Sequence, residues 1–457
     1  MGGFGIGSNK PTGQTQQENA EQNAKRRSWI GRQMEWMGVI APLTDPEGRM
    51  IAKETHENLQ IQAHKSEVLN EKDHQKHIHE YGIKVVKPDF NVPRKFPNSC
   101  RTTWLGHATY LIELPPQVSS NCTRGVTLLF DPIFSSRCSP SQYVGPKRFV
   151  PPPCSISDLP PIDMVFISHN HYDHLDVNSI LQLQKLSEHH KRPTHYFVPL
   201  GHLNWLKETG ISEKCITEMD WWDEVDIKVF VQNTIDTDIM VVCTPSQHCS
   251  GRGVSDQNTC LWSGWLVSQG IESKRLTDKD RAAELKPVDT PFSVFFAGDT
   301  GYRYFPPNMT PIQISELPCC PVFSQIPELY RPPHISLIPI STGSTLSFLK
   351  KFGIEASAPH HLTSSVHCDA ADAVALHLDL KSKCSLPMHY GTFTSGPKEG
   401  LDSIRLLKEA CQSAGVRVNE SEMSLYKEQV KDHADDADQG KSRFEIFAMG
   451  EIGEVMM

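Results

Sequence analysis

The chain has 457 residues, of which 38% are apolar and 22% charged, so it has enough apolar material for a large core and is not disordered throughout. At ~150 residues per domain this length corresponds to about three domains, although two-layer α/β folds often form longer single units. The 45 basic and 54 acidic residues give a net charge of −9, which argues against a protein that holds nucleic acid by neutralising phosphates. The same charge does not exclude a membrane surface, because a local basic or apolar patch is sufficient there.

The cysteine count and the absence of targeting patterns indicate a compartment. The 13 cysteines leave at least one thiol unpaired, and a chain of this size does not need a disulfide framework. No run of 18 apolar residues is present, the start MGGFGIGSNK lacks a charged-then-apolar signal, and Ile6 stands where N-myristoylation requires Ser or Thr. We therefore expect an intracellular, cytosolic protein.

Composition divides the chain into three parts. Residues 1–25 are rich in Gly, Gln and Asn and are predicted to be a disordered tail. Residues 26–99 form an N-terminal arm whose apolar stretch around Trp29 and Trp36 either packs on the domain or contacts a membrane interface. Residues 100–457 are predicted to be the main domain, with a Pro-rich loop insertion at about 303–333 and an acidic linker at 432–438.

Within the main domain, short β-like runs alternate with helical stretches. The predicted strands are Thr102–Glu113, Val126–Asp131, Met164–Ser168, Tyr196–Pro199, Met240–Thr244, Cys260–Val267, Phe292–Gly298, His334–Pro339 and Cys384–His389. The predicted helices are Val177–Ser187, Leu203–Thr209, Ala370–Leu378 and Leu401–Ala414. Hairpin-like pairs of strands with helices between them favour an α/β (α+β) protein of stacked sheets covered by helices.

The densest group of metal-binding side chains follows the apolar run at 164–167. There the sequence reads Ser-His-Asn-His-Tyr-Asp-His, which supplies His169, His171, Asp173 and His174. In an extended stretch residues i and i+2 point to the same side, so His169 and His171 are expected to converge on one ion. Asp173 and His174 lie just beyond and are placed to serve a second ion. Imidazole and carboxylate ligands are typical of zinc, with iron and manganese as alternatives.

Four ligands do not fill two metal sites, so further ligands are expected at the ends of other apolar strands. The candidates are His248 in TPSQH, Asp299 in FFAGDTG and His389 in PMHYGTF. Each of them alone would more often be a structural histidine or a turn aspartate, but the first motif makes metal ligation the better interpretation. A carboxylate is the natural bridge between two cations, and Asp299 after a glycine is well placed for that role.

This order of ligands resembles the metallo-β-lactamase superfamily. Longer segments are similar to the family of N-acylphosphatidylethanolamine-hydrolysing phospholipases D: TWLGHATYLI, FDPIFSSRCSPSQYVGPKRF, ISDLPPIDMVFISHNHYDHL, DWW, TPSQH, FAGDTGY and MHYGTF. The resemblance extends over about residues 101–415. It implies an αββα four-layer sandwich with a dinuclear metal site.

Carried over residue by residue, the resemblance implies two Zn²⁺ per chain. His169, His171 and His248 would hold one ion; Asp173, His174 and His389 would hold the other, and Asp299 would bridge them. It also implies that Tyr172 and His367 bind the substrate phosphate, and that Asp173, Asp299 and His367 are the catalytic residues. The alternatives are a packed aromatic for Tyr172 and an exposed turn or helix-start residue for His367. His107 in WLGHAT is interpreted as a buried core or supporting histidine rather than a ligand.

The activity implied by the resemblance is that of a zinc-dependent phosphodiesterase of the phospholipase D type. It would hydrolyse N-acylphosphatidylethanolamine to N-acylethanolamine and phosphatidic acid through a hydroxide that bridges the metals. Tyr172 and His367 would donate hydrogen bonds to the phosphate or protonate the leaving oxygen. The implied partner is a membrane phospholipid reached by peripheral contact, with no nucleic acid, and family members form homodimers.

The chain departs from this family in places that matter for the substrate. The stretch at 303–333 is longer, STGSTLSFLKKFGIEASAPHHLTSS replaces a Gly-Ala-Tyr segment after Ile340, and CSGRGVSD after His248 replaces a bulkier basic stretch, so a bile-acid contact is not expected there. Other hydrolyses on the same scaffold therefore stay open, such as cleavage of a lactone, a thioester or another phosphodiester. A catalytically silent metal- or lipid-binding paralogue and a nucleic-acid-processing enzyme are further alternatives.

Overall fold

The computed structural model of the chain describes residues 83–96, 98–116, 125–231, 234–253, 255–270, 292–306, 308–342, 363–393, 399–421 and 442–455. The predicted tail, most of the predicted arm and the acidic linker at 432–438 lie outside the described residues, so the division into these parts stays a prediction. No helix among the described residues is both long enough and apolar enough to cross a bilayer.

Two mixed β-sheets form the centre of the molecule. Within the described ranges, the first has seven strands in the order β15-β1-β2-β3-β4-β5-β6 and the second has eight in the order β13-β14-β12-β11-β10-β9-β8-β7. The strands of the first sheet are β1 Cys100–Gly106, β2 Thr109–Glu113, β3 Thr127–Phe130, β4 Met164–Phe166, β5 His195–Pro199, β6 Ile216–Met219 and β15 Ile452–Val455. Those of the second are β7 Glu224–Val231, β8 Thr234–Thr244, β9 Gly264–Gln269, β10 Phe292–Phe296, β11 Ile335–Pro339, β12 Cys384–Met388, β13 Arg417–Glu420 and β14 Arg443–Ile446.

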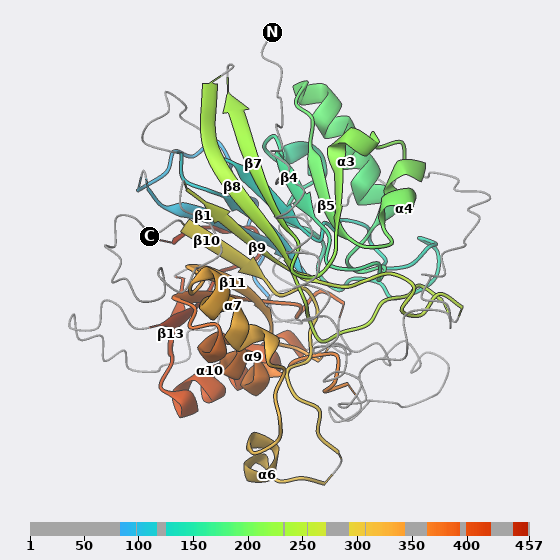
Figure 1. Ribbon diagram of the computed structural model, residues 1–457. Coiled ribbons are helices and arrows are strands. Elements are labelled where there is room, and N and C mark those ends of the chain that lie inside the picture. The colour runs from blue at the N-terminus through green and yellow to red at the C-terminus, as the bar shows by residue number, and fades with distance from the viewer. Residues whose placement is uncertain are drawn as a thin grey trace, which may run out of the picture.

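Helices cover the outer face of each sheet (Figure 1). The α-helices of the described chain are α3 Val177–His190, α4 Leu203–Glu208, α6 Pro311–Ser315, α7 Val322–Tyr330, α9 Ala370–Asp379 and α10 Glu399–Ala414. Short 3₁₀ turns occur at Ile156–Asp158 and Glu213–Cys215. Helices α3 and α4 lie beside the first sheet, and α7, α9 and α10 lie beside the second. The expected αββα four-layer sandwich is therefore confirmed.

Alternation along the central strands explains why the two sheets stack. On β4, Phe166 points between the sheets and stacks on Phe130 with ring centroids 5.0 Å apart, while Val165 packs in the separate cluster that includes Leu183 of α3. Phe130 also meets Phe296 of the second sheet at 4.8 Å. Because successive strand residues face opposite sides, a run that is apolar on both faces is buried between a sheet and a helix layer.

Three predicted strands are wrong in detail. The strand expected at Met240–Thr244 is β8, which already begins at Thr234. The single strand expected over Thr102–Glu113 is a hairpin of β1 and β2, because the backbone at Gly106 (φ 106°) and His107 (φ 52°) takes left-handed conformations that end β1. The strand expected at Cys260–Val267 begins only at Gly264. Strands β6, β7, β13, β14 and β15 were not predicted.

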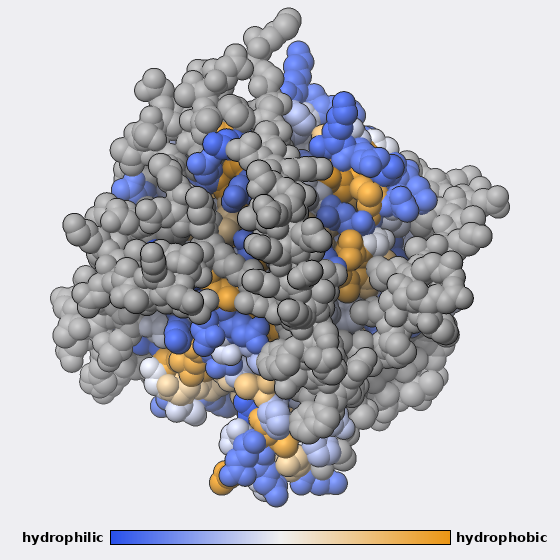
Figure 2. All heavy atoms as spheres, viewed as in Figure 1, coloured by the Kyte–Doolittle hydropathy of each residue, from blue (hydrophilic) through white to orange (hydrophobic). Residues whose placement is uncertain are grey.

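The Pro-rich stretch 303–333 is also more than a loop. It contains α7, whose Phe323 and Ile326 are fully buried against the second sheet, so this half belongs to the helical layer. Only the part around α6 projects from the body (Figure 1). Hydrophobic and hydrophilic side chains are interspersed at that projection (Figure 2), where Ile312 is 73% exposed.

Candidate metal centre

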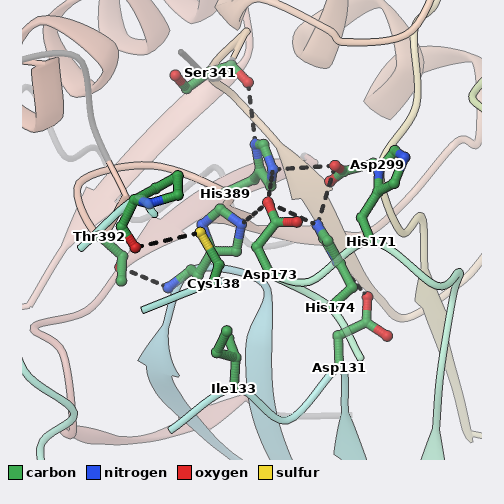
Figure 3. Close-up of polar contacts among 12 residues, drawn as sticks. Asp131, Ile133, Cys138, His171, Asp173, His174, Asp299, Ser341, His389 and Thr392 are labelled. Atoms are coloured by element: carbon green, nitrogen blue, oxygen red, sulfur yellow. Dashed lines mark hydrogen bonds and ion pairs between the residues drawn. The ribbon is translucent and has the colours of Figure 1, made fainter. Parts of the chain in front are cut away.

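The seven predicted ligands lie at the ends of four strands and come from both sheets. The run from His169 to His174 follows β4 of the first sheet. His248, Asp299 and His389 follow β8, β10 and β12 of the second. The sandwich places these four strand ends at one edge, so residues distant in sequence become neighbours (Figure 3).

Gly298 allows the two sheets to approach at this edge. A Cβ atom added there would lie 2.7 Å from Ser168 Cβ and 2.8 Å from the Ser263 carbonyl oxygen, and the backbone φ of +61° is in the left-handed region. Only glycine takes this conformation without a clash. The absence of a side chain therefore lets Asp299 lie directly against the loop that begins with His169.

His169, His171 and His248 form the first cluster. His169 Nε2 lies 2.8 Å from His171 Nδ1, and His248 Nε2 lies 3.2 Å from His169 Nε2 and 3.3 Å from His171 Nδ1. His169 and His248 are buried, at 0% and 1% exposure. Three imidazole nitrogens that converge on one point are a donor set that a divalent cation such as zinc prefers.

The second cluster contains Asp173, His174 and His389, and Asp299 lies between the two clusters. Asp299 Oδ2 is 3.1 Å from His174 Nε2, 3.1 Å from His389 Nε2 and 3.8 Å from His248 Nε2. Asp173 Oδ2 is 3.7 Å from His174 Nε2 and 3.9 Å from His389 Nε2. The side chains of Asp173, His174, Asp299 and His389 point toward one another in the close-up (Figure 3).

Oxygen atoms behind the histidines fix which ring nitrogen faces the clusters. The carbonyl oxygen of Val366 accepts from His248 Nδ1 at 2.8 Å, and a carboxylate oxygen of Asp131 lies 2.7 Å from His174 Nδ1. Because each of these oxygens accepts a hydrogen bond from the outer N–H of the ring, the inner nitrogen of the neutral ring keeps its lone pair for a ligand. Such outer contacts are a usual feature of metal-binding histidines.

Asp131 was not among the predicted site residues. It follows β3, is fully buried, and accepts hydrogen bonds from the Ser168 backbone N–H at 2.7 Å and the Ser168 hydroxyl at 2.5 Å as well as facing His174. Its position in the sequence could have identified it, because an acidic residue directly after the apolar run Leu128–Phe130 repeats the strand-end pattern of the other ligands.

His107 also belongs to this neighbourhood. Its Nε2 lies 3.0 Å from Asp173 Oδ2, its ring centroid is 4.2 Å from that of His389, and it is 3% exposed. The His389 backbone N–H donates to the His107 carbonyl oxygen at 3.1 Å. His107, Asp131 and His389 all have positive φ, of 52°, 37° and 60°, a costly conformation for residues other than glycine that is concentrated at functional sites.

The two residues expected near the phosphate lie in different surroundings. His367 is beside both clusters, with its ring centroid 5.1 Å from that of His248 and 5.4 Å from that of His389, and its Nδ1 is 3.8 Å from Asp299 Oδ2. Gly301 makes this possible, because a Cβ there would lie 2.6 Å from the Ser365 carbonyl carbon. Tyr172 is half-buried, with its ring 4.6 Å from the Arg252 guanidinium carbon.

Burial and neighbouring charges shift the pKa values of the site residues in different directions. Burial, reinforced by the neighbouring histidines, holds the pKa of His169 well below its ordinary value. For His174 burial acts in the same direction, but Asp299 and Asp173 outweigh it and raise the pKa well above its ordinary value. Burial would raise the pKa of Asp299, whereas His174 and His389 hold it well below its usual range.

These residues fit a pair of divalent cations. Among the described residues, His367 Nδ1 and Asp299 Oδ1 are buried polar atoms without a hydrogen-bond partner. Buried polar groups are rarely left unpaired, so they point to a missing partner. The donor groups His169–His171–His248 and His107–Asp173–His174–His389 are each compact enough to surround one ion.

Known proteins are similar to the chain over this region. A family model described as a beta-lactamase superfamily domain matches residues 127–390. The chain is 32% identical over 300 residues to N-acyl-phosphatidylethanolamine-hydrolyzing phospholipase D 1 of Caenorhabditis elegans, and the alignment covers 65% of each protein. An uncharacterized protein of Mycobacterium tuberculosis is 29% identical over 342 residues, which are 73% of this chain and 71% of the relative.

Two further comparisons are more distant. The mitochondrial N-acyl-phosphatidylethanolamine-hydrolyzing phospholipase D of Saccharomyces cerevisiae is 28% identical over 51% of this chain and 43% of its own. The structure of Igni18, a metallo hydrolase of Ignicoccus hospitalis, has a TM-score of 0.41 at 15% identity and covers 79% of this chain and 99% of that one. The chain belongs to the β-lactamase superfamily, and its predicted resemblance to N-acylphosphatidylethanolamine-hydrolysing phospholipases D is confirmed.

Proposed function

We propose that this chain is a zinc-dependent phosphodiesterase that hydrolyses N-acylphosphatidylethanolamine to N-acylethanolamine and phosphatidic acid. The observation that carries the proposal is the place of Asp299, whose Oδ2 lies 3.1 Å from both His174 and His389 and 3.8 Å from His248. A carboxylate between two sets of histidines suits a two-metal hydrolase, because it reaches both ions. The substrate class is taken from the nematode and yeast relatives.

The residues would divide the two ions as follows. His169, His171 and His248 would hold the first; Asp173, His174 and His389 would hold the second; Asp299 would contact both. When bound, two such ions activate water near neutral pH and neutralise charge on a phosphate. The electrostatic balance of the site agrees with this role, since the buried carboxylate of Asp299 and the half-buried carboxylate of Asp173 lie among imidazoles.

His367 would act on the substrate beside the ions. Its ring lies next to His248 and His389 but its side chain keeps 12% exposure, so it is placed at the boundary between the ion site and the space outside. From there it would donate a hydrogen bond to the phosphate or protonate the leaving oxygen. The Tyr172 hydroxyl would donate a hydrogen bond to the same phosphate.

The proposed substrate sets the cellular surroundings. A phospholipid with three acyl chains stays in a bilayer, so the protein would reach it by peripheral contact with a membrane from the cytosol. We further propose a homodimer, as the resemblance to the phospholipase family implies.

The test combines metal analysis with product analysis. Purified protein should contain two equivalents of zinc and convert N-acylphosphatidylethanolamine in vesicles to N-acylethanolamine and phosphatidic acid, identified by mass spectrometry. Asp299→Asn and His169→Ala should each lower turnover at least 1,000-fold (~4 kcal/mol). His189→Ala, an exposed histidine of α3, should leave turnover unchanged.

A panel of lactones, thioesters and other phosphodiesters separates this proposal from its alternatives. Zinc-dependent cleavage of one of those compounds without cleavage of the lipid would replace the substrate but keep the ion site. Two equivalents of zinc without any hydrolysis would indicate a metal-binding protein that is not an enzyme. Full activity of Asp299→Asn would overturn the ion assignment itself.

A further inference from the structure

Arg252 contacts two aromatic rings beside the first cluster. It is the fourth residue after His248, in the stretch where the sequence departs from the resemblance. Its guanidinium carbon is 4.6 Å from the ring centroid of Tyr172 and 4.9 Å from that of Trp205 on α4. A planar guanidinium stacks on aromatic faces in this way, which an ammonium group does not reproduce.

The same guanidinium reaches both ends of the ligand loop. Arg252 Nε donates to the Asn170 carbonyl oxygen at 2.6 Å, and Nη2 donates to the Leu175 carbonyl oxygen at 2.5 Å. Asn170 lies between His169 and His171, and Leu175 directly follows His174. A single side chain therefore ties together the start and the end of the segment that supplies four of the seven proposed ligands.

A second hydrogen bond joins the same two segments in the opposite direction. The Asn170 side-chain oxygen accepts from the Gly251 backbone N–H at 2.7 Å, and Asn170 is 8% exposed. Asp256 holds the backbone on the other side, because its carboxylate accepts from the N–H groups of Arg252 at 2.7 Å and Gly253 at 2.6 Å. The segment after His248 and the segment around His169 are thus joined through backbone and side chain in both directions.

We propose that Arg252 is a positioning residue for the ion site. It holds the 169–175 loop and the segment after His248 in one fixed relation, so that His169, His171 and His248 keep the separation at which they share an ion. The inference rests on the metal site proposed above. Support one step behind the ligands is commonly worth a 10–100-fold change in metal affinity (~1.4–2.7 kcal/mol).

The directions of the Arg252 hydrogen bonds favour this role over direct capture of a substrate phosphate. Nε and Nη2 donate to carbonyl oxygens of the ligand loop, and the guanidinium carbon lies 4.6 Å and 4.9 Å from the ring centroids of Tyr172 and Trp205. A residue that bound the substrate phosphate would direct such donors outward in the fork geometry that suits phosphate. Arg252 therefore acts on the reaction through the histidines.

The experiment compares Arg252→Lys and Arg252→Gln with wild type, after circular dichroism confirms folding. Zinc affinity is measured by competition with a chromophoric chelator, and cobalt is substituted so that its visible bands report the ligand geometry. Both variants are expected to bind the more weakly held zinc 10–100-fold less tightly and to show altered cobalt bands. With zinc in excess, kcat should fall while KM stays within about twofold.

Arg443→Lys is the matched control. Arg443 pairs with Glu445 on β14, next to the start of β12 and therefore at the opposite end of that strand from His389. It is expected to leave zinc affinity and cobalt bands unchanged.

Two results would overturn the proposal. One is wild-type zinc affinity with unchanged cobalt bands in both Arg252 variants. The other is a rise in KM at constant zinc affinity, which would assign Arg252 to substrate binding. A wild-type protein that binds zinc but does not cleave the lipid would refute the proposed function alone, because the zinc and cobalt measurements would still decide the role of Arg252.

Discussion

Asp131 and His174 form a pair that is completely removed from solvent, with 2.7 Å between Asp131 Oδ2 and His174 Nδ1 and 0% exposure of both side chains. The carboxylate also accepts two hydrogen bonds from Ser168. It therefore fixes the ring of a proposed ligand and the backbone just before His169 at the same time.

Replacement of this carboxylate by an amide should disturb the ion site more than the fold. In Asp131→Asn the amide oxygen still accepts from Ser168, but its NH₂ group faces His174 Nδ1, so the ring is driven to the tautomer whose proton points at the cluster. We expect a 10–100-fold loss of zinc affinity, measured by chelator competition. Asp89→Asn, which alters an exposed carboxylate, serves as the control; equal zinc affinity in both variants would contradict the prediction.

His107 should tolerate only residues that accept a left-handed backbone. With φ at 52°, asparagine is compatible with the turn but cannot place a ring nitrogen 3.0 Å from Asp173 Oδ2. His107→Asn is therefore expected to fold and to bind zinc about tenfold more weakly. His107→Val should have a free energy of unfolding ~1–2 kcal/mol lower than that of His107→Asn, because a branched residue is strained in this backbone conformation. Urea unfolding of the two variants measures the difference, and equal stabilities would refute the strain argument.

The close contact at Gly298 can be tested by comparison with Gly415, which has a similar positive φ. Gly298 and Gly415 have φ of +61° and +70°, but an added Cβ meets Ser168 and Ser263 at the first and nothing within 4 Å at the second. Both alanine variants carry the left-handed strain, while Gly298→Ala adds overpacking of about 1–3 kcal/mol. We expect Gly298→Ala to be less stable in urea than Gly415→Ala and to lose turnover as Asp299 is displaced. Similar stabilities would show that the sheet edge opens without cost.

Buried histidines far from the candidate metal centre should make the protein sensitive to acid. His377 on α9 is fully buried, lies 2.7 Å from the Ser385 hydroxyl, and burial lowers its pKa to about 4. The unfolded chain takes up a proton near pH 6.5 while the folded chain does not. The free energy of unfolding is therefore unaffected by this histidine above pH 6.5. It declines by up to about 3 kcal/mol as the pH falls toward 4, because protonation of His377 favours the unfolded chain.

The comparison is between the unfolding free energies of wild type and His377→Gln at pH 7 and pH 5, at constant zinc. The stability advantage of wild type should shrink at pH 5, because the glutamine variant has no proton to gain. His189→Gln, at an exposed position, should follow wild type. An equal change in the free energy of unfolding between pH 7 and pH 5 for wild type and His377→Gln would contradict the prediction.

Sequence patterns predicted the central layers well and the edges poorly. β4 and the Val294–Phe296 part of β10 are continuous apolar runs, which two-sided burial requires, and α10 has a helical stripe. The hairpin at Gly106 was missed because a left-handed turn of Gly106 and His107 interrupts an apolar run without a polar loop. Edge strands such as β13 are half-exposed and polar, so their pairing depends on neighbours that the sequence does not reveal.

The site residues were predictable where a dense motif or a strand end marked them. The structure brings His169, His171, His248, Asp173, His174, Asp299 and His389 together, although the assignment of ions to them stays a proposal. Asp131 and Arg252 were not predicted, because they act through Ser168, His174 and two backbone carbonyls. Such support depends on three-dimensional contacts and has no spacing of its own in the sequence.

The distribution of the ligands over both sheets has a consequence for biosynthesis. The histidine-rich loop of the first sheet is synthesised well before Asp299 and His389, so a nascent chain offers an ion only an incomplete set of donors. Tight ion binding requires that the second sheet has been made and has docked on the first. A chain that is truncated or misassembled beyond β8 should therefore bind the proposed ions weakly, so that tight metal binding would distinguish the completed molecule.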